Sequence, residues 1–256
     1  MDVMLNTHLD DKFSPTWQKA YIHIQKKLAA GKLHAGQAIS ELSLAKELGI
    51  SRTPIREALS RLAAEGIVER ISNRRLAVVT FTRQDIVDLY ELREALEGYA
   101  VGKAARQVVP QVEIHRLQRF AESILELKEE LNRSDKLELD EEQMHQFVVK
   151  DLGFHTMLIR MARNARILKT VNETRLLIRI FSMQRHGHNQ DLLGQIYLSH
   201  TAILKAVADQ DPELATRLTS EHIQRSLHER LDDFDHWEVE ASVRRSFPYF
   251  FGISPL

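Results

Sequence analysis

The sequence predicts a mainly α-helical protein that carries one small β-hairpin. Only 10 glycines and 6 prolines occur in 256 residues, which favours long helices with short connections over a many-stranded sheet. Beyond residue 80, apolar residues recur with the 3.6-residue period of helices, and no segment alternates as a strand does. The hairpin is expected near residue 70, where turn-forming residues separate two short apolar runs.

The composition is that of a folded protein with a sizeable core. Hydrophobic residues make up 43% of the chain and charged residues 28%, which is not typical of disorder. The complete lack of cysteine excludes disulfides, thiolate metal sites and cysteine catalysis. No apolar run is long enough to cross a bilayer, and residues 1–6 do not resemble a secretory signal. We therefore expect a cytoplasmic protein with no membrane partner.

Charge is distributed unevenly along the chain. The segment from Lys12 to Val79 holds 12 lysines and arginines against 5 acidic residues, although the whole chain has a net charge of −1. The rest of the chain is therefore acidic. A basic front and an acidic rear indicate that the N-terminal part meets a polyanion.

Helix signals occur in order through the basic region. A first helix is predicted over residues 15–30, with Gly31 at its end. Residues 33–39 are typical of a turn that leads into a short extended segment. A second helix is expected between a cap at Ser40 and a stop at Gly49. Its inward residues should be Leu42, Ala45 and Leu48.

A third helix and the hairpin complete this region. The helix is predicted over residues 52–65, capped by Ser51, and the strands over residues 67–70 and 76–79. Helix, short helix, tight glycine turn, helix and hairpin is the order of a winged helix-turn-helix. We place this domain at residues 12–80.

The third helix would present polar residues at the end that such motifs insert into the major groove. Arginine can form two hydrogen bonds with guanine, and threonine can reach a phosphate or a thymine methyl group. The basic hairpin can follow the phosphate backbone. The alternative for any single arginine is that it only solvates a helix face. The residues expected to contact DNA are Ser51, Arg52, Thr53, Arg56, Arg74 and Arg75.

The remainder predicts an all-α bundle over residues 81–236, followed by an aromatic tail at 237–256. Thr82 and Asp85 form a capping-box-like start for its first helix. The apolar stripe of that helix comprises Ile86, Leu89, Leu92, Leu96, Tyr99 and Ala100. Further helices are expected at 112–131, 142–163, 165–185, 192–209 and 212–234, with Asp191 and Asp211 as caps. The tail either packs on the bundle or a partner subunit, or has no structure.

Four polar residues occupy apolar faces of the bundle. Asp151 and His155 are four residues apart and share one helix face, while His200 and His222 lie on two later helices. Buried imidazoles and carboxylates need partners. They could surround a divalent cation, and nitrogen and oxygen donors suit Zn²⁺, Ni²⁺ or Mn²⁺. The alternative is a set of core histidines that bond only to polar neighbours.

The N-terminal motifs resemble a known family. Residues 51–59 read SRTPIREAL, and with residues 37–41 and 64–68 they resemble the DNA-binding domain of GntR-type bacterial transcription regulators. One departure is Arg75, which stands where the family usually has a glycine at the tip of the wing. Glycine adopts positive φ most cheaply, so Arg75 implies another turn geometry or strain.

The C-terminal motifs resemble the FCD effector domain of the FadR subfamily. They are DLGFH at 151–155, HTAILKAV at 200–207, REALE at 93–97, and His222. The resemblance implies that Asp151, His155, His200 and His222 hold a divalent metal, with zinc favoured over nickel and manganese. A small organic acid would complete the metal's shell. Arg93 would bind this effector or pair with Glu97, and Arg175 is a weaker candidate for the effector.

We therefore expect a ligand-responsive transcription repressor. A homodimer would bind palindromic operator DNA, and the organic acid would shift its conformation. The alternative is a metal-dependent enzyme acting on a small carboxylate, because open metal coordination can activate water. The sequence offers no dedicated general base or nucleophile motif for it, so we expect no enzyme. A third possibility is an architectural DNA binder with a metal-free bundle.

Overall fold

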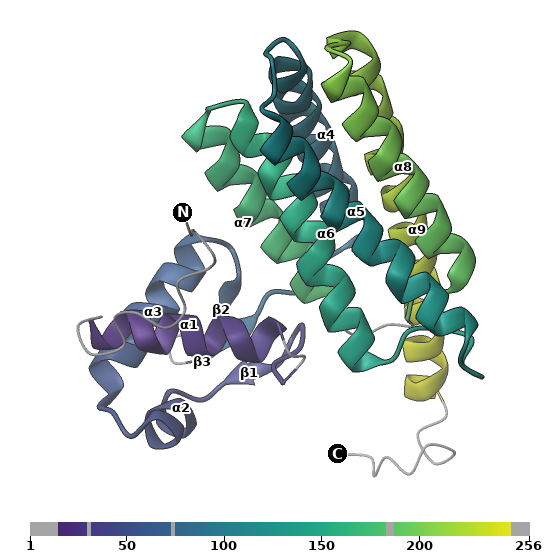
Figure 1. Cartoon of the computed structure of the whole chain (residues 1–256). Helices are drawn as coiled ribbons and strands as arrows, with labels where there is room; N and C mark the ends of the chain where they lie inside the picture. Colours follow the sequence, from purple (N-terminus) through teal and green to yellow (C-terminus); the bar gives the residue numbers. More distant parts are fainter. Residues whose placement is uncertain (1–14, 30–31, 73–74, 183–186, 247–256) are drawn as a thin grey trace. The chain divides into compact units, whose positions relative to one another are not determined.

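The computed structural model describes residues 15–29, 32–72, 75–182 and 187–246 (Figure 1). The predicted fold class is confirmed: helices dominate, and the one sheet of the described residues is small and antiparallel. The chain divides into two compact units, residues 1–81 with 176–184, and residues 82–175 with 185–256. Among the helices that the structure describes, none combines the length and apolar character that a membrane crossing requires.

The first unit is a winged helix-turn-helix. Its strands follow the order β1-β3-β2, and both pairs are antiparallel. Its core consists of apolar side chains from α1, α2, α3 and the sheet, which include the fully buried Ile24, Ile55 and Leu59. The elements of this unit are α1 (Thr16–Ala29), β1 (Ala38–Ile39), α2 (Glu41–Leu48), α3 (Arg52–Ala64), β2 (Val68–Ser72) and β3 (Arg75–Val78).

The inward face of α2 differs from the prediction. Leu44 and Ala45 are buried and Leu48 is partly buried, whereas Leu42 is 54% exposed. Two residues correspond to about 200° around a helix, so Leu42 lies opposite Leu44. The ends of α2 agree with the prediction. The side chain of Ser40 accepts a bond from the Ser43 amide, and Gly49 ends the helix with φ of 65°.

Ser51 occupies the N-cap position of α3, but its side chain accepts no capping hydrogen bond. The reason is local. An N-cap side chain normally accepts from the second or third helical amide, and the third residue here is Pro54, which has no N–H. The predicted cap is therefore correct in position but not in bonding, and the Ser51 residue stays exposed.

The wing is longer than predicted. Strand β2 extends to Ser72 and β3 begins at Arg75, which pairs with Ser72. Arg75 is thus a strand residue, and among the described non-glycine residues only Arg163 and Gln210 have positive φ. The strain considered for Arg75 is therefore absent. Arg74, expected to contact DNA, lies outside the described residues.

The second unit is a bundle of long helices (Figure 1). Helix α4 packs against α9, α5 packs between α6 and α8, and α8 packs against α9. Buried apolar residues from these helices, such as Val101, Leu117, Phe154 and Ile203, form a shared core. The helices are α4 (Arg83–Ala105), α5 (Gln111–Asn132), α6 (Glu141–Met161), α7 (Ala165–Ser182), α8 (Gln190–Ala208) and α9 (Pro212–Ser246), of which α7 belongs to this unit only up to Arg175.

Two of the predicted helix caps are present in the bundle, and a third predicted cap residue lies inside its helix. The capping box of Thr82 and Asp85 is present, and Asp211 accepts from the Leu214 amide. Helix α8 is capped by Asn189, so Asp191 lies in its first turn instead.

Helix α9 is longer than expected. It was predicted to end at residue 234 but continues to Ser246, because no glycine or proline interrupts that stretch. Residues 237–246, the first part of the segment predicted as the tail, are therefore helical. The aromatic residues 247–251 lie outside the described residues. Within α9, Asp235 accepts from the Nε of Arg83, the first residue of α4, at 3.1 Å.

A close approach between α5 and α6 helps to position the site. A Cβ atom on Gly153 would lie 2.5 Å from the Phe120 ring, which is below any normal contact. Gly153 stands between Asp151 and His155 on α6, so the glycine allows the two helices to pack closely beside both residues. At Gly194 on α8, an added Cβ would meet only the Lys128 side chain, at 3.4 Å.

We predict that Gly153→Ala lowers the free energy of unfolding by about 1 kcal/mol, because the clash with Phe120 outweighs the gain in helix propensity. Gly194→Ala, the matched control, should raise it by up to about 1 kcal/mol. Urea unfolding measures both. Equal stabilisation by the two substitutions would contradict the packing of α5 on α6.

Candidate metal centre and nucleic-acid interface

The four predicted ligands come together inside the bundle. Asp151 and His155 lie one turn apart on α6, His200 projects from α8 and His222 from α9. One donor atom from each lies within 4.8 Å of the others. The Nε2 atoms of His155 and His200 lie 3.6 and 3.5 Å from Oδ1 of Asp151, and Nε2 of His155 lies 3.3 Å from Nε2 of His222.

These distances suit a cation. Two ligands about 2.1 Å from one Zn²⁺ ion lie roughly 3.4 Å apart in tetrahedral coordination. His200 also indicates a cation site, because this residue is fully buried and neither of its ring nitrogens forms a hydrogen bond within the described residues. Its ring stacks on Phe154 at 4.0 Å. A buried unpaired imidazole is costly, and a cation would remove that cost, so the four residues fit a divalent metal.

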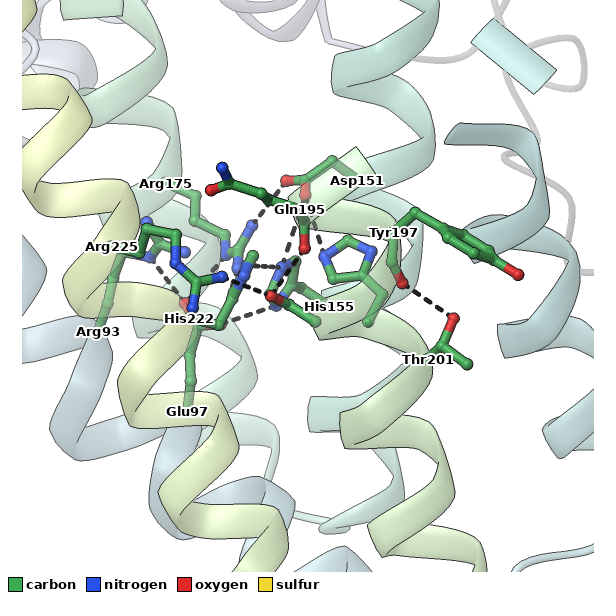
Figure 2. A network of polar contacts seen from close by, with 12 residues as sticks. Arg93, Glu97, Asp151, His155, Arg175, Gln195, Tyr197, Thr201, His222 and Arg225 are labelled. Atoms are coloured by element: carbon green, nitrogen blue, oxygen red, sulfur yellow. Dashed lines mark hydrogen bonds and ion pairs between the residues drawn. The ribbon is translucent and has the colours of Figure 1, made fainter. Parts of the chain in front are cut away.

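Glu97 on α4 is a central residue of this site that the sequence analysis named only as a possible partner of Arg93 (Figure 2). It is fully buried and accepts hydrogen bonds from Arg93 Nε at 2.8 Å and from Arg175 Nη2 at 2.7 Å. Its Oε2 also lies 3.2 Å from Nδ1 of His155. A proton on Nδ1 directed at this carboxylate leaves the lone pair of Nε2 facing Asp151 and His222.

The two predicted effector-binding arginines are both paired in this structure. The Arg93 guanidinium is 6% exposed and bonds Glu97, which is the alternative that the sequence left open. Arg175 on α7 spans Glu97 and Asp151, with its Nη1 3.5 Å from Oδ2 of Asp151. The sequence signal for Glu97 is its position one turn after Arg93, but the partnership with α6 and α7 depends on tertiary packing.

The buried polar pair also explains why the apolar stripe predicted for α4 is only partly correct. Leu92 and Tyr99 are 41% and 55% exposed, whereas Arg93 and Glu97 occupy the inner face. The other members of the stripe include Ile86 and Ala100, and both are buried.

Burial and neighbouring charges shift the pKa values of the cluster. Burial raises the pKa of Glu97, but Arg175 and Arg93 outweigh it and hold the pKa well below the usual value. For Asp151, burial again opposes a larger lowering of the pKa by His155, Arg175 and His200. Burial and His155 lower the pKa of His200 to about 3, and burial with His200 lowers that of His222 well below 6.5. These two imidazoles are therefore neutral at pH 7 and available as ligands.

An open groove leads to this cluster between α8 and α9. Its volume is 390 Å³, and His222 is part of its wall. Arg225 donates to the Ser199 hydroxyl across the groove at 2.8 Å, and Figure 2 shows Arg225 and Gln195 beside the cluster. The full lining is Gln195, Leu198, Ser199, Ala202, Leu218, Glu221, His222 and Arg225.

The first unit exposes most of the predicted DNA-contacting residues. Ser51, Arg52, Thr53 and Arg56 are all exposed around the first two turns of α3, and Arg75 is exposed on β3. Arg52 and Arg56 both donate to Glu41 of α2. The helix N-terminus also favours phosphate through its dipole, so the arrangement is suited to a nucleic-acid interface.

Both halves of the chain match families of known proteins. Residues 16–78 match the family described as bacterial regulatory proteins, gntR family, and residues 88–225 match the FCD domain. The Nta operon transcriptional regulator of Aminobacter aminovorans is 32% identical, over 82% of this chain and 92% of its own length. A probable D-xylose utilization operon transcriptional repressor of Paenarthrobacter nicotinovorans is 30% identical, over 80% and 84%.

Solved structures support the fold. The structure of E. coli McbR/YncC has a TM-score of 0.69 at 19% identity and covers 86% of this chain and 98% of that one. The matching domains and relatives are transcriptional regulators and not enzymes, as the sequence predicted.

We predict that the metal-free protein loses stability as the pH falls from 7.5 to 5.5. Unfolded histidines have a pKa near 6.5, whereas those of folded His200 and His222 are lower. Below about pH 6.5 the unfolded chain therefore binds protons that the folded chain does not, and the unfolding free energy drops by about 1.4 kcal/mol per pH unit for each group. Urea unfolding of chelator-treated protein measures this slope.

The control for this prediction is His200→Gln, which removes one titrating imidazole and should make the slope shallower by about 1.4 kcal/mol per pH unit. The lowered pKa values of Glu97 and Asp151 act only at more acidic pH. Equal stability at pH 7.5 and 5.5 would show that the histidines are not held in the neutral form by burial.

Proposed function

Because the chain belongs to the GntR family of bacterial transcription regulators and carries an FCD domain, we propose that it is a metal-containing repressor that binds palindromic operator DNA and responds to a small organic acid. The observation that carries this proposal is the pairing of two sites in one chain. One is the exposed set of basic residues on α3, and the other is the buried cluster of three histidines and Asp151.

Operator recognition is assigned to the N-terminal end of α3. Arg52 and Arg56 supply the forked N–H groups that read guanine in the major groove, and Thr53 supplies a hydroxyl and a methyl group. Ser51 and the wing residues Arg74 and Arg75 contact the phosphate backbone, which fixes the register of the helix on the duplex. Two copies of the chain would read the two half-sites of a palindrome.

The metal is assigned to Asp151, His155, His200 and His222. A divalent metal bound there supplies a Lewis-acidic centre with open coordination positions that a carboxylate can fill. Zinc is favoured over nickel and manganese. Burial keeps the imidazoles of His200 and His222 neutral, and Glu97 holds His155 in one orientation.

The charge balance of the site favours an anionic effector. Two carboxylates, Asp151 and Glu97, face two guanidiniums, Arg93 and Arg175, and the neutral His200 and His222 add no charge. A divalent cation therefore brings an uncompensated positive charge into a buried region, which a carboxylate would neutralise. We assign effector contacts to Arg93 and Arg175, whose N–H groups the effector would share with Glu97, and entry to the groove beside Arg225.

Repression is inferred from relatives. The P. nicotinovorans protein and a 25% identical Bacillus subtilis protein are named as repressors of the D-xylose utilization and gluconate operons. We propose that this chain is also a repressor and that it forms a homodimer. The effector would change operator affinity through any difference in its binding to the two conformations of the dimer.

We predict that Arg56→Ala reduces operator affinity by at least tenfold, because it removes a fork that reads a base. Its operator should first be defined by selection from random DNA duplexes with the unaltered protein, followed by fluorescence anisotropy at fixed salt. Arg61→Ala is the matched control, since Arg61 is an exposed arginine in the last turn of the same helix and pairs with Glu57. Equal loss in both variants would contradict the assigned recognition end.

We predict that His222→Ala abolishes stoichiometric metal binding and the response to organic acids, but leaves operator binding intact. Metal content is measured by elemental analysis of protein purified without an affinity tag. The response is measured by thermal shift with mono-, di- and tricarboxylic acids, each with and without ZnCl₂. His228→Ala is the control, because His228 is exposed on the same helix. A metal-free native protein with no acid-induced shift would refute the sensing half of the proposal.

A further inference from the structure

One carboxylate holds both base-reading arginines of the first unit. The Nη2 group of Arg52 donates to Oε2 of Glu41 at 2.8 Å, and the Nε group of Arg56 donates to the same oxygen at 2.9 Å. Glu41 is the first residue of α2 and is 25% exposed, whereas the arginine side chains are 54% and 59% exposed. The acid is thus the more fixed member of the group.

We propose that Glu41 is a positioning residue for operator recognition, which orients the guanidiniums of Arg52 and Arg56 toward bases and discourages their use on phosphates. This inference rests on the proposed function, because it requires that the end of α3 reads DNA. It assigns to α2 a part in specificity that does not depend on direct contact with the duplex.

The hydrogen-bond inventory supports the orienting role. A guanidinium has five N–H groups, and recognition of guanine uses two of them, directed at O6 and N7. Glu41 takes the single Nε–H of Arg56 and therefore leaves both of its terminal nitrogens for a base. It takes one N–H from Nη2 of Arg52, so that the Nη1 side of that fork stays available. Glu41 thus orients each arginine while leaving enough N–H groups free to contact a base.

The position of Glu41 is itself well determined. The side chain of Ser40 caps α2 just before it, and the left-handed Gly49 ends the helix. Leu44 and Ala45 anchor α2 in the core that it shares with α3. A carboxylate in the first turn is also favoured by the helix dipole. The arginines consequently meet an acceptor that is fixed relative to the axis of α3.

The net charge of Glu41, Arg52 and Arg56 favours contacts with bases over contacts with phosphates. Partial burial raises the pKa of Glu41, but the hydrogen bonds from Arg52 and Arg56 outweigh it, so the group is ionised at neutral pH. The three side chains together carry one positive charge instead of two. A phosphodiester beside them is attracted less and is repelled by the carboxylate. Base edges carry no net charge, so the acid penalises them less than it penalises phosphates.

The test compares four forms of the full-length protein: the unaltered chain, Glu41→Gln, Glu41→Asp and Glu47→Gln. Glu47 is the matched control, because it is an ion-paired glutamate on the same helix whose partners are Lys27 and His23 of α1. Each form is used to select from random DNA duplexes. The affinity for the selected operator is then divided by the affinity for a scrambled duplex at the same salt, and melting temperatures check the fold.

We expect Glu41→Gln to lower this specificity ratio about tenfold, through weaker operator binding and stronger binding to scrambled DNA. Glu41→Asp keeps the charge but shortens the side chain by one methylene, so it should also lower the ratio and weaken the base preference at one position of each half-site. Glu47→Gln should match the unaltered chain, and all four melting temperatures should agree closely.

Three results would overturn the proposal. One is an unchanged ratio in Glu41→Gln, and another is an equal change with Glu47→Gln, which would indicate a general charge effect. The third is an unchanged ratio in Glu41→Asp, which would show that the position of the carboxylate does not matter. If instead the unaltered chain selects no common sequence, the proposed operator recognition fails first, and this outcome is distinct from the other three.

Discussion

The interior of the helical unit depends on the buried carboxylate of Glu97. It joins α4 to α7 through Arg175 and to α6 through His155, and it also compensates Arg93 on its own helix. A buried ion is stable only when it is paired, and loss of one partner leaves the others uncompensated. The orientation of His155 and the inward direction of both arginines therefore follow from one side chain.

The chain uses the same group, one glutamate shared by two arginines, in two different environments. At Glu97 all three side chains are at least nine-tenths buried, so the ion pairs bear on the stability of the bundle. At Glu41 the arginines are more than half exposed, where ion pairs contribute little to folding. In the role proposed for Glu41, the exposed group acts through the direction and the net charge that it presents to a ligand.

Local sequence signals correctly predicted the features that depend only on a few residues adjacent in the sequence. The caps at Ser40 and Thr82, the stop at Gly49 and the shared face of Asp151 and His155 all depend on a few adjacent positions. The gathering of Asp151, His155, His200 and His222 was expected, but the network of buried charges beside it was missed. The Glu97 network requires side chains from three helices. Because Arg93 and Glu97 occupy the inner face of α4, Leu92 on the same helix is exposed to solvent. The missing cap bond of Ser51 was readable in principle, since Pro54 lacks the required N–H.

The unbroken length of α9 has a mechanical consequence. His222 and Asp235 lie 13 residues apart on this helix, which corresponds to roughly 20 Å along its axis. Asp235 contacts Arg83, the first residue of α4, directly after the segment that ends the DNA-binding unit. Because α9 is one continuous helix, the positions of His222 and of the ion pair at the start of α4 are linked through a single element of the bundle.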